Sequence, residues 1–129
     1  EPITITWMDN MKQGEIVIDI GANVGMYSLM SSVSRGTKVY AFEPEASNYN
    51  LLCHNIRLNN VADKVTAFCA GTLDYDGFSV LNIAENRDVG PGGSCHTVDE
   101  EVNVCAGTIY IYIYHLHSFI FAFSLYVAS

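Results

Sequence analysis

The first half of the chain alternates short apolar runs with stretches of helical periodicity. The runs EIVIDI, TKVYAF and KVTAFCAG, at residues 15–20, 37–42 and 64–71, each predict a strand, and EIVIDI is apolar enough for burial on both faces of a sheet. Between them, MYSLMSSVS and the segment after Pro44 place apolar residues at helical spacing, and Gly36 suits a left-handed helix end. The order strand–helix–strand–helix–strand with short connections predicts an α/β fold with a parallel sheet.

The second half has a different pattern. GFSVLNIAE, at residues 77–85, predicts a further strand, and a polar, Gly-rich loop follows it. TIYIYIYHLHS, at residues 108–118, alternates with the period of two of a strand, while the whole of 108–128 is also long and uncharged enough to contact a membrane. We therefore expect a sheet-bearing domain at residues 1–101, with an apolar segment at 102–129 in the same domain or appended to it.

Composition narrows the class of protein. The 129 residues are half hydrophobic, and the formal net charge of −8 argues against binding nucleic acid or an anionic membrane. No secretory signal is visible, so we expect a cytoplasmic chain, or a membrane-associated one if the apolar segment inserts. The four cysteines have no metal-binding spacing and are expected to be reduced thiols. Because the sequence starts at Glu1, we expect a processed chain or a fragment.

The turn after the first strand, GANVG, carries the candidate chemistry. Gly21 and Gly25 allow a sharp turn and a close approach of a ligand to the backbone. Asp19 can bind a cation or a hydroxyl, or cap the next helix, and Asn23 can bind a ligand or hold the turn. Glu43 ends the second strand about twenty residues later, where an acid commonly binds both ribose hydroxyls. The pattern predicts a nucleoside ligand with a charged end.

Two cofactors fit that description, a nicotinamide dinucleotide and S-adenosylmethionine. The loop is GxxxG and lacks the middle glycine that lets a pyrophosphate approach in GxGxxG sites. An acid before the turn, Asp19, suits the sulfonium and amino groups of S-adenosylmethionine better than a diphosphate. S-adenosylmethionine is therefore the preferred cofactor, and an NAD-binding oxidoreductase is an alternative.

The stretches VIDIGANVGMYSL, KVYAFEPEASNYNLLCHNIRLNN and VTAFCAG resemble the FkbM type of class I S-adenosylmethionine-dependent methyltransferases, over about residues 13–72. The resemblance implies a Rossmann-like methyltransferase sheet, S-adenosylmethionine as cofactor, and methyl transfer to a hydroxyl of a small molecule or sugar. That acceptor agrees with the net charge, from which no nucleic acid partner is expected. The cofactor residues that it implies, from the methionine end through the ribose to the adenine, are Asp19, Gly21, Asn23 and Gly25, then Glu43, then Cys69 and Ala70.

The likeness ends where the family pattern continues with a strand ending in an acidic D-x-E-G-like motif beside the methyl-transfer centre. No acidic residue follows Glu101, and the candidate for that fourth parallel strand, IYIYIYHLHS, offers histidines instead. The candidate bases are His96, His115 and His117, although for the last two we favour a pair of polar residues on a half-exposed strand. No third ligand accompanies that pair, so no metal site is predicted. The chain is expected to be a truncated or diverged methyltransferase, or a non-catalytic cofactor-binding module.

Overall fold

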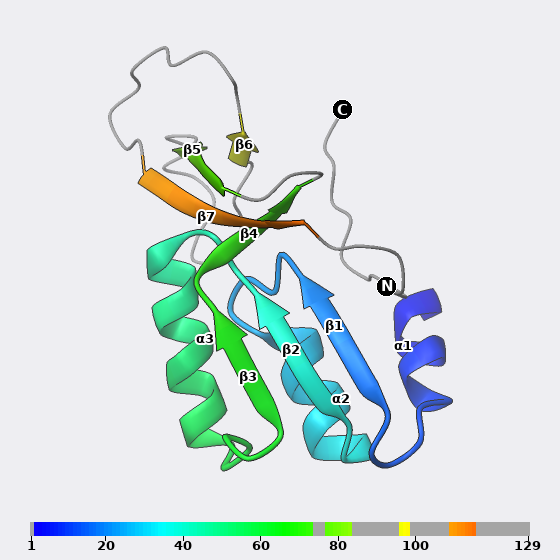
Figure 1. Ribbon diagram of the computed structural model, residues 1–129. Helices are drawn as coiled ribbons and strands as arrows, with labels where there is room; N and C mark the ends of the chain where they lie inside the picture. The colour runs from blue at the N-terminus through cyan, green and yellow to red at the C-terminus, as the bar shows by residue number, and fades with distance from the viewer. Residues whose placement is uncertain (1, 74–76, 84–95, 99–108, 116–129) are drawn as a thin grey trace.

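The computed structural model describes residues 2–73, 77–83, 96–98 and 109–115. Its first part contains the predicted strand–helix alternation, which is confirmed. The elements are α1 (Pro2–Asp9), β1 (Ile16–Ile20), α2 (Met26–Arg35), β2 (Lys38–Phe42), α3 (Ala46–Leu58) and β3 (Val65–Phe68). The three strands form a parallel sheet in the order β1-β2-β3 (Figure 1). The pairing is parallel because each helix carries the chain back to the edge where the preceding strand began.

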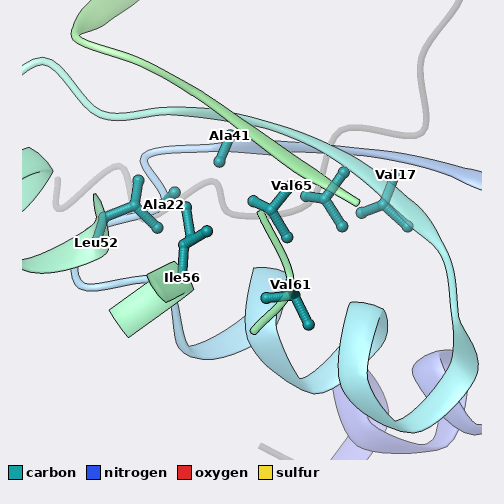
Figure 2. Close-up of a cluster of buried hydrophobic side chains, with 8 residues drawn as sticks. Val17, Ala22, Ala41, Leu52, Ile56, Val61 and Val65 are labelled. Carbon is teal, nitrogen blue, oxygen red and sulfur yellow. The ribbon is translucent and has the colours of Figure 1, made fainter. Parts of the chain in front are cut away.

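One face of the parallel sheet packs against the helices, and the register of the strands determines which residues lie on that face. Val17, Val39 and Val65 lie side by side across the three strands, and all three are buried. Leu52 and Ile56 of α3 join this core, as the gathered side chains in Figure 2 show. Because side chains alternate between faces with a period of two, the next row on the same inward face is the one that contains Asp19.

The opposite face of the sheet is more open than the sequence predicts. Ile16 is 64% exposed and Tyr40 is 39% exposed, and β1 alternates between buried and more exposed positions along its length. The expectation that EIVIDI is buried on both faces is therefore wrong for the part of the chain that the structure describes. A run of branched apolar residues gives strand propensity but does not tell how many faces are covered.

The two helix boundaries nearest the site have clear local causes. α2 starts after Gly25, at φ +90°, and ends at Gly36, whose left-handed backbone lets its N–H bond back to the Ser32 carbonyl. α3 starts at Glu45, whose carboxylate accepts the backbone N–H groups of Ser47 and Asn48 at 2.9 and 2.7 Å. Both helices begin at the carboxyl edge of the sheet.

The predicted third strand is interrupted at Cys69. The Glu43 N–H donates to the Phe68 carbonyl at 3.0 Å, at the end of the β2–β3 ladder, and the chain then turns away. Ala70 begins a second sheet in the order β4-β7-β5-β6, built from β4 (Ala70–Leu73), β5 (Gly77–Ile83), β6 (His96–Val98) and β7 (Ile109–His115). β7 is the predicted Ile-Tyr strand, but it pairs with β4 and β5 and not with the parallel sheet of β1–β3.

Two further features bear on the sequence predictions. The helix α1, drawn in dark blue in Figure 1, is not predicted by the sequence pattern, since its Ile-Thr alternation favours a strand. Pro2 stands at its first position, and Asp9 near its end forms an ion pair with Arg35 of α2. Among the described residues, no helix is long and apolar enough to cross a membrane. Most of the candidate membrane segment, residues 116–128, lies outside those residues.

Candidate functional site

Asp19 is an acid on the inward face of β1. It lies opposite Ala41 in the register, and its side chain is only 2% exposed. Its Oδ2 accepts the Ser28 hydroxyl at 2.6 Å, while Oδ1 has no hydrogen-bond partner among the residues that the structure describes. Burial raises the pKa of the Asp19 carboxyl, and the Ser28 hydroxyl and backbone N–H oppose that rise. One oxygen of this carboxylate is therefore held by Ser28, and the other is buried and unpaired in the described part of the chain.

The glycine loop has a left-handed backbone conformation at three positions, which glycine and asparagine adopt more readily than other residues. Gly21 has φ +71°, Asn23 φ +54° and Gly25 φ +90°, all in the left-handed region. A Cβ at Gly25 would lie 2.4 Å from Leu52 Cδ1, so the loop packs directly on α3. The N–H groups of Gly21 and Ala22 both donate to the Phe42 carbonyl, which ties the loop to the end of β2.

Glu43 comes directly after β2 and reaches back to this loop. The Asn23 N–H donates to its Oε2 at 2.7 Å, and the Glu45 N–H donates to its Oε1 at 2.9 Å. Burial raises the pKa of Glu43; the two N–H groups and the Asn48 side chain oppose the rise, and the Glu45 carboxylate adds to it. Each carboxylate oxygen can accept two hydrogen bonds, so the backbone orients Glu43 without exhausting its capacity. The predicted pair of loop and distant acid is thus brought together.

Side chains from α3 that the sequence did not single out support this arrangement. Asn55 donates from Nδ2 to the Val24 carbonyl at 2.9 Å, which fixes the loop from the helix side. Asn48 is buried and hydrogen-bonds to Glu43, although its position favours a surface residue from sequence alone. Ser28 was missed as well. For the α3 residues, the sequence feature that bears on these contacts is helical spacing. It places Asn48, Leu52 and Asn55 on one face of α3 but does not show what they contact.

The expected adenine-side residues lie at the bend after β3. Cys69 is exposed, and desolvation followed by the negative charges of Glu43 and Glu45 raises the pKa of its thiol. A raised pKa favours the neutral form of this thiol. Ala70 is buried and begins β4. Beside this bend the Phe42 and Phe68 rings stack with centroids 4.8 Å apart.

Two of the three candidate bases, His96 and His115, belong to strands of the second sheet. His96 opposes Ile83 of β5 in the register, and His115 opposes Leu73 of β4. His117 lies outside the described residues, and the catalytic roles of all three stay predictions. Among the residues described, no group of three or more His, Cys, Asp and Glu side chains could hold a metal ion.

Comparison with known proteins identifies the class. A family model for the TRM5/TYW2 methyltransferase domain matches residues 4–120. The chain belongs to this family. Its fold is thus the Rossmann-like start of a methyltransferase domain, and the cofactor of the family is S-adenosylmethionine. The class I methyltransferase expectation is confirmed, whereas the FkbM type is not supported and TRM5/TYW2 takes its place.

Two curated proteins that are similar to this chain are named as different enzymes. Methyltransferase sdnD of Sordaria araneosa is 34% identical over 95 residues, which are 73% of this chain and 35% of that protein. A tRNA(Phe) (4-demethylwyosine(37)-C(7)) aminocarboxypropyltransferase of Pyrococcus horikoshii is 33% identical over 71 residues, 55% of this chain and 26% of that protein. The chain therefore spans between a quarter and about a third of these relatives.

A solved structure supports the fold alone. An RNA methyltransferase of Salinibacter ruber in complex with S-adenosyl-L-homocysteine superposes with a TM-score of 0.51 at 15% identity, covering 55% of this chain and 48% of that one. At this identity the likeness concerns the arrangement of strands and helices and carries nothing about an acceptor.

Proposed function

We propose that the carboxyl edge of β1 and β2 binds S-adenosylmethionine and that the protein transfers its methyl group to a small-molecule acceptor. The observation that carries the proposal is the placement of two buried acids, Asp19 and Glu43, on either side of a glycine loop. Buried acids destabilise a fold unless they have partners, so two of them at one edge favour a functional role.

Asp19 fits the methionine end of the cofactor. Its Oδ1 is buried and has no partner in the described part of the chain, and a buried carboxylate attracts a cation strongly because the local dielectric is low. The proposed partners are the amino group and the positive charge of the sulfonium. The positive φ angles of Gly21 and Gly25 support the backbone turn that a bound amino acid end would approach.

Glu43 fits the ribose. Two backbone N–H groups already fix its carboxylate, so little side-chain entropy remains to be lost when it accepts hydroxyl groups. We propose that Cys69 and Ala70 lie on the adenine side because they follow β3. A neutral Cys69 thiol, which its raised pKa favours, would add no charge beside the adenine.

When bound, S-adenosylmethionine supplies an electrophilic methyl group on a sulfonium. The residues at the carboxyl edge of β1 and β2 would hold and orient it, and a base, if the acceptor needs one, would come from outside this edge, with His96, His115 and His117 as candidates. The net charge of −8 and the acids at this edge favour a small acceptor over a polyanion such as tRNA. A hydroxyl acceptor rested on the FkbM resemblance, so the chemical class of the accepting atom stays open to experiment.

The test is a transfer assay with S-adenosylmethionine labelled in the methyl group, run with small-molecule acceptors in one arm and tRNA in the other. We expect label in the small-molecule arm. Label in tRNA alone would contradict the acceptor and keep the cofactor, whereas binding of S-adenosylhomocysteine without transfer in either arm would favour the non-catalytic module. NADH should not quench the fluorescence of the protein; such quenching would favour the oxidoreductase alternative.

A further inference from the structure

The contact between Ser28 and Asp19 is a buried link between α2 and β1. The Ser28 hydroxyl donates to Oδ2 of Asp19 at 2.6 Å, and the two residues are 0% and 2% exposed. Oδ1 of the same carboxylate has no partner among the described residues. A hydrogen bond to an ionised acceptor is short and strong, so Ser28 fixes one oxygen and determines where the other points.

We propose that Ser28 is a positioning residue of this site, whose hydroxyl holds the Asp19 carboxylate so that Oδ1 faces the cationic methionine end of S-adenosylmethionine. The inference rests on the proposed function, because it concerns how the cofactor-binding acid is prepared. It predicts that the hydroxyl of Ser28, and not merely its small size, is needed.

The neighbouring serines show that size alone does not explain Ser28. Ser31 and Ser32 are also completely buried on α2, but their hydroxyls donate to the Ser28 and Leu29 carbonyls of their own helix, each at 3.2 Å. Such local bonds are common for serine within helices and have little consequence beyond the helix. Of these three hydroxyls, the one of Ser28 is hydrogen-bonded to a side chain of the sheet.

Ser28 also affects the charge of Asp19. Burial raises the pKa of Asp19, and the groups that oppose the rise both belong to Ser28. The residue opposite on β2 is the neutral Ala41, and the fully buried residues of α2 are serines, so neither element brings a charge to Asp19. The other acids at this edge, Glu43 and Glu45, are not among the causes of the Asp19 shift. Loss of the Ser28 hydroxyl should therefore raise the pKa of Asp19 further and leave less carboxylate near neutral pH.

The experiment measures the affinity for S-adenosylhomocysteine between pH 5.5 and 8.5 for the wild type, Ser28→Ala and the control Ser32→Ala. Alanine removes one oxygen and favours helix, so we expect both variants to fold, which circular dichroism checks before the titrations. We expect Ser28→Ala to bind about tenfold more weakly at pH 7, the effect of losing a hydrogen bond to a charged group. As the pH is lowered, the affinity of Ser28→Ala should begin to fall at a higher pH than that of the wild type. Toward pH 8.5 its affinity should recover in part, while Ser32→Ala should follow the wild type at every pH.

The outcomes separate the two proposals. Equal affinities of Ser28→Ala and Ser32→Ala across the pH range, or a weakening of Ser28→Ala that does not change with pH, would overturn the role of Ser28 and leave the cofactor site intact. Failure of the folded wild type to bind S-adenosylhomocysteine at any pH would overturn the proposed function itself, and the role of Ser28 with it.

Discussion

Asp19 occupies a position where packing alone would select an apolar residue. It shares the inward face of the sheet with Val17 and Val39, and its carboxylate is desolvated there. Such a residue lowers the stability of the ligand-free protein, which is the usual relation between stability and function at a binding site. The stability of the apo protein therefore reports on this site.

The first prediction concerns the pH dependence of unfolding. Burial raises the pKa of Asp19 in the folded state, so the folded state binds this proton more tightly than the unfolded state does. The stabilising contribution is present below the ordinary carboxyl pKa of about 4 and is lost as pH rises through the raised folded pKa. Urea unfolding of the apo protein at several pH values should show that Asp19→Asn flattens this decline. An unchanged pH slope in the variant would rule out a desolvated carboxylate at this position.

The second prediction concerns the tight contact of the glycine loop with α3. In Gly25→Ala, the new Cβ has to accept a backbone φ of +90° and would also clash with the packed Leu52 side chain. The variant should therefore lose about 2–4 kcal/mol of unfolding free energy. Gly14→Ala is the matched control, since Gly14 has φ +82° but nothing within 4 Å of its Cβ position, and should lose about 1–2 kcal/mol. Equal losses in urea titrations would show that the contact with Leu52 relaxes freely.

At the scale of residues, the sequence predicts acids but not their partners. Asp19 and Glu43 stand out because their places relative to two strand ends can be inferred from the order of elements. Ser28, Asn48 and Asn55 do not, because a hydrogen bond across 9 or 31 residues depends on how a helix is rotated about its axis. That rotation is decided by packing, which periodicity describes only coarsely.

At the scale of elements, α3 is the helix that contacts the candidate site at more than one point. Its start at Glu45 adjoins Glu43, and its middle turns contact the glycine loop through Leu52 and Asn55. An element that contacts both the loop and the ribose acid couples local helix stability to the geometry of the site.

The third prediction is a loss of the α3 cap. Glu45→Ala removes the acceptor for the Ser47 and Asn48 N–H groups and should lower the unfolding free energy by about 1 kcal/mol. Glu45→Ser supplies another capping oxygen and should recover most of that loss in the same thermal or urea titration. A Glu45→Ser variant as unstable as Glu45→Ala would mean that capping is not the contribution of Glu45.

The fourth prediction concerns the tie between α3 and the loop. Asn55→Ala leaves the Val24 carbonyl without its side-chain donor and should weaken the binding of S-adenosylhomocysteine about 3–10-fold, on the scale of one net hydrogen bond of about 1 kcal/mol. Asn50→Ala, an exposed asparagine of the same helix, is the control and should bind like the wild type. Calorimetric titration of both variants checks the prediction, and identical affinities would show that the loop keeps its shape unaided.

The features that the sequence does not predict depend on contacts between distant parts of the chain. The interruption at Cys69 is invisible in KVTAFCAG because the strand ends where the β2–β3 ladder ends. The strand Ile109–His115 was predicted from its alternation, but its partners β4 and β5 could not be inferred from it. α1 has a β-like pattern whose helical state accompanies tertiary contacts such as the ion pair from Asp9 to Arg35.

At the scale of the whole molecule, the distribution of charge agrees with a small, cationic ligand. The chain carries 14 acidic and 6 basic residues, and the acids Asp19, Glu43 and Glu45 gather at the carboxyl edge of the parallel sheet. Ligands of open α/β sheets bind at that edge, so the fold and the charges favour the same site. The chain covers 26% and 35% of its curated relatives, and transfer itself is a proposal for the whole protein.

The most direct test is calorimetric titration of the protein with S-adenosylhomocysteine, for the wild type, Glu43→Ala and the control Glu15→Ala. Glu15 is exposed, so its variant makes the same change of net charge away from the site. We predict binding at one site, weakened by about 1–3 kcal/mol in Glu43→Ala, which is roughly 5–150-fold, and unchanged in Glu15→Ala. No binding by the folded wild type, or equal affinity in wild type and Glu43→Ala, would contradict the account.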